Sequence, residues 1–214
     1  MASFSVPQPL LRGHLHLAGA VLAPVGLAIL LILAETPRGY IGGAVFGFGL
    51  LILYSASAAN HLAPAGPRMR AMLQRMDHAA IFIFIAAAYT PFCLVFSPAW
   101  AAGMLATVWI LAIAGAAMRV AWAGMPRLLA VACYLAIGWV GVAALGETGR
   151  VFHPAAMALV IGSGVVFSLG AMVYGLRRPD PFPRVFGYHE VFHACVVAGT
   201  ALLYGAVAGF VVTG

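Results

Sequence analysis

Charge is what this sequence has least of. It contains no lysine and only five acidic residues, so charged side chains make up 7% of its 214 residues. Soluble domains carry about 25%. A chain this poor in charge cannot cover a water-facing surface, which excludes a soluble globular protein. A hydrophobic fraction of 64% equally excludes an intrinsically disordered chain. The class that remains is a polytopic membrane protein.

Cysteine is scarce as well. Cys93, Cys133 and Cys195 fall inside apolar segments and show no paired spacing. We therefore expect small packing residues, and neither disulfides nor metal ligands. The apolar residues run continuously for about 20 positions without alternation, which predicts membrane-spanning helices rather than strands.

The few charged residues divide the chain into apolar segments, and a bilayer core requires roughly 20 helical residues to cross. The first segment is longer than the core of a cleaved signal peptide and contains Pro24, so we predict that it belongs to the bundle. The sequence predicts an all-α, seven-transmembrane helix bundle that forms a single domain over residues 1–214. Its helices are expected at about 13–34, 40–61, 77–96, 99–120, 127–145, 152–176 and 188–211.

The arginines predict the orientation of this bundle. A cytoplasmic N-terminus places nine of the 11 arginines on the cytoplasmic side and leaves only Arg38 and Arg150 outside. Because positive charge is retained on the inner side of membranes, we expect a cytoplasmic N-terminus and an external C-terminus. The net charge of +6 then reflects topology and contact with anionic lipid headgroups, not nucleic-acid binding.

Function is expected at polar residues that membrane spans normally exclude. His61 ends the second predicted helix, Asp77 opens the third, and His189 and His193 lie in the first turns of the seventh. All four fall at the predicted cytoplasmic side, so three helices bring imidazoles and a carboxylate to one depth. His78 points about 100° away from its neighbour on a helix, and we leave it outside the site.

The spacing of His189 and His193 suits metal binding, because residues i and i+4 project from one face of a helix. With His61 as a third imidazole, the fourth tetrahedral position is open to water, as in catalytic zinc sites. Asp77 would orient or deprotonate that water, and Ser57, one turn before His61, would support the ligands or an oxyanion. An imidazole-rich set of ligands favours zinc over ions that prefer oxygen.

Each of these residues has a structural alternative. His61 suits the C-terminal helix dipole, Asp77 suits a helix N-cap, and Ser57 can bond to its own helix backbone. The segment 189–193 also matches H-E-x-x-H, the zinc-protease signature, with Glu190 as general base. No convincing second acidic ligand follows in a later span, so an intramembrane protease is the weaker alternative.

Three segments resemble the signatures of a known family, the haemolysin III family. These are Ser57-Ala58-Ala59-Asn60-His61; Asp77-His78-Ala79-Ala80-Ile81 running to Ala88-Tyr89-Thr90-Pro91-Phe92; and His189-Glu190-Val191-Phe192-His193. The family is the bacterial branch of the progestin and adipoQ receptors and is related more distantly to alkaline ceramidases. In order and on the expected helices, the three motifs extend the resemblance over nearly the whole chain.

The chain departs from the family pattern at two places. Asn60 stands where an aromatic residue is commoner, and the segment 12–16 follows the usual start of the first helix only loosely. Within that segment we expect His16 to be a snorkelling helix-end residue rather than a ligand. Neither departure affects the proposed ligands.

The resemblance implies a zinc site made by His61, His189 and His193, with Asp77 contacting the zinc-bound water and Ser57 matching the serine of the family's S-x3-H motif. In the eukaryotic receptors and ceramidases, such a site is associated with the hydrolysis of lipid amides. For bacterial members, haemolysis and membrane homeostasis are proposed roles.

The sequence thus predicts a zinc-dependent hydrolase of a lipid amide or ester, with its site near the cytoplasmic face and membrane lipids as its partners. A sensor or receptor-like protein with a structural zinc is the main alternative. A haemolytic pore is less favoured, because the outer half of the spans has almost no polar residues. A bis-histidine haem protein would need histidines facing each other across a wide cavity.

Overall fold

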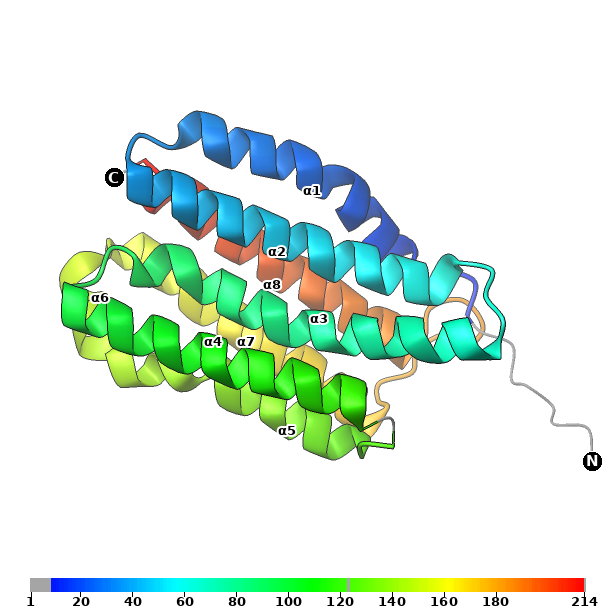
Figure 1. Cartoon of the computed structure of the whole chain (residues 1–214). Coiled ribbons are helices and arrows are strands. Elements are labelled where there is room, and N and C mark those ends of the chain that lie inside the picture. The colour runs from blue at the N-terminus through cyan, green and yellow to red at the C-terminus, as the bar shows by residue number, and fades with distance from the viewer. Residues whose placement is uncertain (1–8, 123, 214) are drawn as a thin grey trace, which may run out of the picture.

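The computed structural model describes residues 9–122 and 124–213, and these residues form a bundle of helices (Figure 1). Seven helices are long and apolar enough to cross a membrane, which confirms the predicted fold class. The elements are α1 (His14–Leu33), α2 (Pro37–Leu62), α3 (Pro67–Cys93), α4 (Pro98–Ala121), α5 (Arg127–Gly138), a 3-10 helix η1 (Val140–Ala144), α6 (Leu145–Val151), α7 (Pro154–Leu176) and α8 (Tyr188–Phe210).

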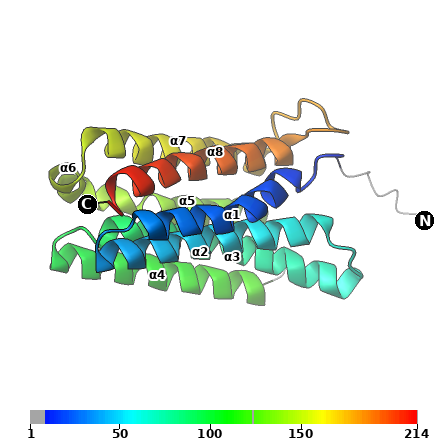
Figure 2. The same ribbon diagram turned by 90° about the horizontal axis from the view of Figure 1, so that it is seen from above.

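The spanning helices lie roughly parallel to one another around a common centre (Figures 1 and 2). Helix α2 packs between α1 and α3, α3 packs on α4, and α7 packs on α8. Helix α1 also contacts α8, while α5 bridges α7 to α3 and α4, so the ring of helices closes. The first and last spans are therefore neighbours, and residues near the start of the chain can contribute to a site on α8.

Large apolar side chains cover the outside of the bundle. Val21, Ile32 and Ile110 are exposed, whereas Phe46 and Phe82 are fully buried between helices. In a membrane-spanning bundle the exposed apolar side chains face lipid tails, which need no polar covering. Proline occupies the first position of α2, α3, α4 and α7, where the missing N–H would have had no helical partner.

The fifth span does not form one helix over 127–145 as the sequence predicted. Helix α5 ends at Gly138, and the chain continues through η1 and the short α6. Tyr89 of α3 explains the break, because its hydroxyl donates to the Gly138 carbonyl at 2.6 Å and accepts from the Gly141 N–H at 2.8 Å. A side chain from another helix thus takes the place of helical backbone bonds.

The third helix begins at Pro67, ten residues before the predicted start at Asp77. Gly66 and Pro67 provide the N-cap and first position, and the polar residues that follow extend the helix beyond the apolar segment. Hydropathy indicates where the apolar segment ends, which need not be where the helix ends. Asp77 therefore lies inside α3 and does not cap it.

Helices α1, α3, α5 and α8 begin at the end of the bundle where α2, α4 and α7 finish (Figure 1, right). We call this the arginine-rich end, because nine of the 11 arginines lie in or beside the helix termini there, and only Arg38 and Arg150 lie at the other end. This segregation agrees with the distribution from which the topology was predicted. That the arginine-rich end faces the cytoplasm stays a prediction.

Candidate metal centre

Three imidazoles meet at the arginine-rich end. His61 lies in the last turn of α2, and His189 and His193 lie in the first two turns of α8. One ring nitrogen from each residue lies within 4.8 Å of the other two. The structure therefore confirms that the three histidines come together and could hold a metal ion, as the i, i+4 spacing predicted.

One pair of ring nitrogens has the spacing of two ligands of a tetrahedral metal. The Nε2 atoms of His61 and His189 are 3.2 Å apart, close to the roughly 3.3–3.4 Å between two ligands of an ion bound at about 2.0–2.1 Å. His193 Nδ1 is buried and has no hydrogen-bond partner in residues 9–122 and 124–213. A buried ring nitrogen that no protein group satisfies is available to a metal. The donor set of three nitrogens suits zinc.

Asp77 faces this cluster from the third turn of α3. Its Oδ2 atom lies 3.8 Å from His61 Nε2, and its side chain is buried. Because the helix starts ten residues earlier, the N-cap alternative for Asp77 is wrong. The carboxylate is thus held next to an imidazole inside the bundle, where it can accept a proton or orient a polar molecule. Its catalytic role stays a prediction.

Asn60 is a site residue that sequence reasoning missed. Its Nδ2 donates to Asp77 Oδ2 at 2.8 Å, and both side chains are buried. Its backbone carbonyl accepts from Arg70, which also donates to Ala63 O at 3.1 Å and so holds the end of α2. The sequence marked Asn60 only as a departure from the family pattern. A polar residue beside His61 in an apolar span was the signal that could have identified it.

Ser57 lies one turn before His61 and is 1% exposed. Its hydroxyl makes no close hydrogen bond in the described part of the chain and its polar neighbour is Asp77, so the alternative that it bonds to its own helix backbone is wrong. Thr90 does make such a bond, to Ala86 O at 2.9 Å. Ser57 is one of the residues that line the cavity described below, although its hydroxyl itself is buried.

His16 does not snorkel to the surface as the sequence predicted. It is 3% exposed and stacks on His193, with ring centroids 3.8 Å apart and an interplanar angle of 13°. Gly13 allows this approach. Its φ of 81° is in the left-handed region, and a Cβ there would lie 2.6 Å from the Cβ of His61. Helix α1 can therefore start against α2, which turns His16 inward as a fourth imidazole of the cluster.

Glu190 has a structural task. One carboxylate oxygen accepts from the Gly187 N–H at 2.8 Å, completing the cap of α8, and the other lies 2.5 Å from Arg12 Nε. This pair joins the starts of α1 and α8, the helices that carry His16 and His193. With one oxygen hydrogen-bonded in the cap and the other in an ion pair with Arg12, Glu190 is held away from the role of a general base, and the protease alternative loses its main support.

His78 points away from the cluster, as the helical geometry predicted. Its Nδ1 accepts from Arg119 Nε at 3.0 Å, and its carbonyl accepts from the hydroxyl of Tyr134 at 3.1 Å. Arg119 lies in the last turn of α4. The neighbours Asp77 and His78 thus face different groups: Asp77 faces the histidine cluster, and His78 faces Arg119 and Tyr134.

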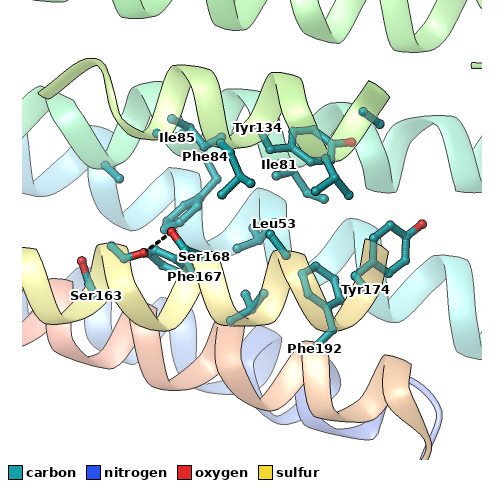
Figure 3. Close-up of a pocket in the computed structure, with 18 of the residues that line it drawn as sticks. Leu53, Ile81, Phe84, Ile85, Tyr134, Ser163, Phe167, Ser168, Tyr174 and Phe192 are labelled. Carbon is teal, nitrogen blue, oxygen red and sulfur yellow. Dashed lines mark hydrogen bonds between the residues drawn. The ribbon is translucent and has the colours of Figure 1, made fainter. Parts of the chain in front are cut away.

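A cavity of about 840 Å³ extends from the histidines into the bundle. Such a volume is typical of sites for small organic molecules. Figure 3 shows Phe84 of α3 and Tyr134 of α5 on one side of it, and Phe167 and Tyr174 of α7 on the other. Phe96 and Phe152 also line it, near the opposite end of these helices. The cavity therefore combines an apolar interior with one polar end, the arrangement that an acyl chain with a polar head requires.

Comparison with known proteins agrees with these features. A family model of haemolysin-III-related proteins matches residues 4–204, which include every residue of the cluster. A protein named Hemolysin-3 from Bacillus cereus is 27% identical over 212 residues, covering 96% of this chain and 93% of its own length. A Hemolysin-3 homolog from Bacillus subtilis strain 168 is 26% identical over 205 residues, covering 94% and 93%.

Proposed function

The chain belongs to the haemolysin III family of membrane proteins, and on this premise we propose that it is a zinc-dependent hydrolase that cleaves an amide or ester bond of a membrane lipid. One observation carries the proposal. Three imidazoles and the Asp77 carboxylate meet where a largely apolar cavity reaches its polar end. We place the protein in a bacterial inner membrane because the relatives it matches are bacterial, and we place the site near the cytoplasmic face because of the arginine distribution.

Each residue of the site has a separate role in the proposed reaction. His61, His189 and His193 would hold zinc, which when bound supplies Lewis-acid activation of water and of the scissile carbonyl. Asp77 acts as general base, since one of its oxygens lies 3.8 Å from His61 Nε2. Asn60 holds that same oxygen and so fixes the carboxylate, leaving the other oxygen to exchange the proton.

Ser57 and the cavity act on the substrate. The Ser57 hydroxyl, which makes no close hydrogen bond within the described residues, would turn towards the oxygen of the scissile carbonyl and donate to it as negative charge develops there. The aromatic side chains along the cavity bind the acyl chain and keep water away from the polar end, where electrostatic interactions consequently strengthen. The substrate would reach this cavity from the bilayer, passing between helices.

A non-catalytic sensor with a structural zinc is the second candidate. It is favoured by the linkage of helices at the cluster, because the ligands come from α2 and α8 and His16 adds α1. A metal would brace these three helices even without a reaction. A haemolytic pore is disfavoured, because mostly apolar side chains line the cavity beyond the histidines.

The deciding experiment measures metal content and lipid hydrolysis on the same detergent-purified samples. We expect about one zinc per chain, lost in His189→Ala and in His193→Ala. His153→Ala is the matched control, because His153 lies at the opposite end of the bundle against Phe210 and should keep the metal. A well-folded protein without metal would overturn the proposal.

Asp77→Asn separates the hydrolase from the sensor. In the hydrolase, this variant keeps zinc and loses at least a hundredfold in turnover of lipid amides or esters. In the sensor, it changes no activity, and chelation of zinc only lowers the melting temperature. Retained turnover in Asp77→Asn would assign the cluster to the sensor.

A further inference from the structure

Arg119 is a buried cation without an anionic partner. Its side chain lies in the wall of the cavity, and the residue is 7% exposed. Its contacts are neutral acceptors. Nε donates to the Nδ1 atom of His78 at 3.0 Å, and Nη1 donates to the Trp122 carbonyl at 3.4 Å. Within residues 9–122 and 124–213, no ion pair includes Arg119.

Such an arrangement is unfavourable unless an anion joins it. A guanidinium cannot lose its proton in a protein, so Arg119 keeps its charge. A buried charge is normally paired, and charged residues within membrane spans usually face an internal cavity and a partner. Since the protein provides neutral acceptors only, the natural counter-charge for Arg119 is a ligand in the cavity.

The other charged residues that line the cavity are mostly positive as well. Arg127, at the start of α5, lines the same cavity and lies with its guanidinium carbon 5.9 Å from the ring centre of Tyr174. In the described part of the chain, Asp77 is the one carboxylate that lines the cavity. Five arginines line it as well: Arg12, Arg70, Arg119, Arg127 and Arg177. Of these, Arg12 is already paired with Glu190.

We propose that the cavity binds a lipid with an anionic, phosphate-bearing headgroup, and that Arg119 and Arg127 pair with the phosphate while the acyl chain lies along the aromatic wall. The guanidinium fork matches phosphate oxygens, and a lipid supplies both the anion and the chain that this cavity suits. The identification of this lipid as the substrate rests on the proposed hydrolase; its binding does not.

The positions of the two polar groups indicate which part of the lipid carries the anion. Hydrolysis breaks the bond between the acyl carbon and the headgroup oxygen or nitrogen. The hydroxyl of water goes to the acyl carbon, and its remaining proton goes to the leaving headgroup. The new fatty-acid carboxylate therefore forms at the histidine cluster. Arg119 bonds to His78, which points away from that cluster, so the counter-ion of Arg119 belongs to the leaving headgroup instead.

The proposal is tested by native mass spectrometry of the full chain in detergent. The probes are ether-linked phosphatidylglycerol and ether-linked phosphatidylcholine, which have no hydrolysable acyl bond and differ in net charge. We expect phosphatidylglycerol to bind at least tenfold more tightly, because only its headgroup carries an uncompensated negative charge. Palmitate tests a bare carboxylate, and inorganic phosphate tests a free anion.

Substitutions of single arginines test which residues bind the phosphate. Arg119→Gln and Arg127→Gln should each weaken phosphatidylglycerol binding about tenfold, and Arg119→Lys should weaken it less, because the charge stays but the fork is lost. Arg68→Gln is the matched control. It removes one positive charge from an exposed position at the same end and should change the affinity by less than about twofold. If Arg119→Gln fails to fold, Arg127→Gln decides, since the Arg127 side chain contacts the Tyr174 ring but makes no hydrogen bond or ion pair within residues 9–122 and 124–213.

Four outcomes overturn the inference. They are equal affinity for the two ether lipids, an equal loss in Arg68→Gln, Arg119-dependent binding of palmitate in place of the phospholipid, and displacement of the lipid by inorganic phosphate. Failure of the proposed function looks different. Selective, Arg119-dependent binding without turnover of the ester-linked lipid leaves this inference intact and removes the hydrolase. Equal turnover of charged and neutral lipids would support the hydrolase and remove this inference.

Discussion

Asn60 offers the sharpest test of how this site is organised, because it makes one defined contact. Its side chain donates a 2.8 Å hydrogen bond to the buried Asp77 carboxylate. In Asn60→Ala that oxygen loses its donor, and a hydrogen bond to a charged group contributes about 1.5–3 kcal/mol. We expect the free energy of unfolding to fall by about this amount when it is measured by denaturant titration in mixed micelles.

A double-mutant cycle assigns this loss to the contact itself. In an Asp77→Ala background the carboxylate is absent, so removing Asn60 should have little further effect. The coupling energy should then recover most of the expected 1.5–3 kcal/mol. Ser55→Ala, at an exposed position one turn earlier on α2, is the matched control. If the two substitutions prove additive within about 0.5 kcal/mol, the contact does not hold Asp77 and the reasoning fails.

The same substitution has a predicted effect on turnover. If the bond is needed to hold the general base, its loss lowers kcat by about 10- to 150-fold, since each 1.4 kcal/mol corresponds to a factor of ten. The KM for the lipid should change little, because Asn60 lies at the polar end of the cavity and the acyl chain binds along the aromatic side chains. Bound zinc, measured by elemental analysis, should also stay at the wild-type level. Lost zinc would show that Asn60 maintains the ligands rather than the base.

Three further outcomes are expected. His16→Ala should weaken zinc binding about tenfold in a competition titration. His16→Phe should keep most of the affinity, because a phenyl ring can still stack on His193. Equal losses in the two variants would assign the effect to the nitrogens of His16. Glu190→Gln should lower stability by about 1.5–3 kcal/mol through the lost pair with Arg12 but keep zinc and turnover; lost turnover with intact zinc would restore Glu190 as a base. Tyr89→Phe should lower the free energy of unfolding by about 1–3 kcal/mol, because two backbone groups at the helix break lose a partner; an unchanged value would show that the break does not depend on Tyr89.

Much of the fold could be predicted because its causes are local. Continuous apolar residues identify a span whatever it packs against, and seven such spans are present. The i, i+4 spacing of His189 and His193 fixes their common face once α8 is a helix. Span counting also placed His61 at the same depth, because an even number of further crossings brings the chain back to the same end.

One error arose because hydropathy does not mark helix ends, and two arose where the cause lies in another helix. Asp77 was expected at a helix start because hydropathy marks only the apolar segment, while the helix itself extends back to Pro67. The break after Gly138 depends on the hydroxyl of Tyr89, which lies 49 residues away in the sequence. The inward position of His16 depends on how Gly13 packs against His61. No local pattern contains these contacts.

The two groups that sequence reasoning undervalued, His16 and Arg119, have a common explanation. Both were interpreted from their place near the ends of spans, where histidine and arginine often reach towards headgroups. The ring of helices is closed by α1 against α8, however, and the opening it surrounds reaches the arginine-rich end. A polar residue near a helix end can therefore face inward as easily as outward, and the direction follows from the rotation of the helix. His16 faces the metal ligands, and Arg119 faces the cavity. The position of an arginine along a span does not show whether it only sets the topology or binds a ligand. Burial of its charge without a counter-charge does show this.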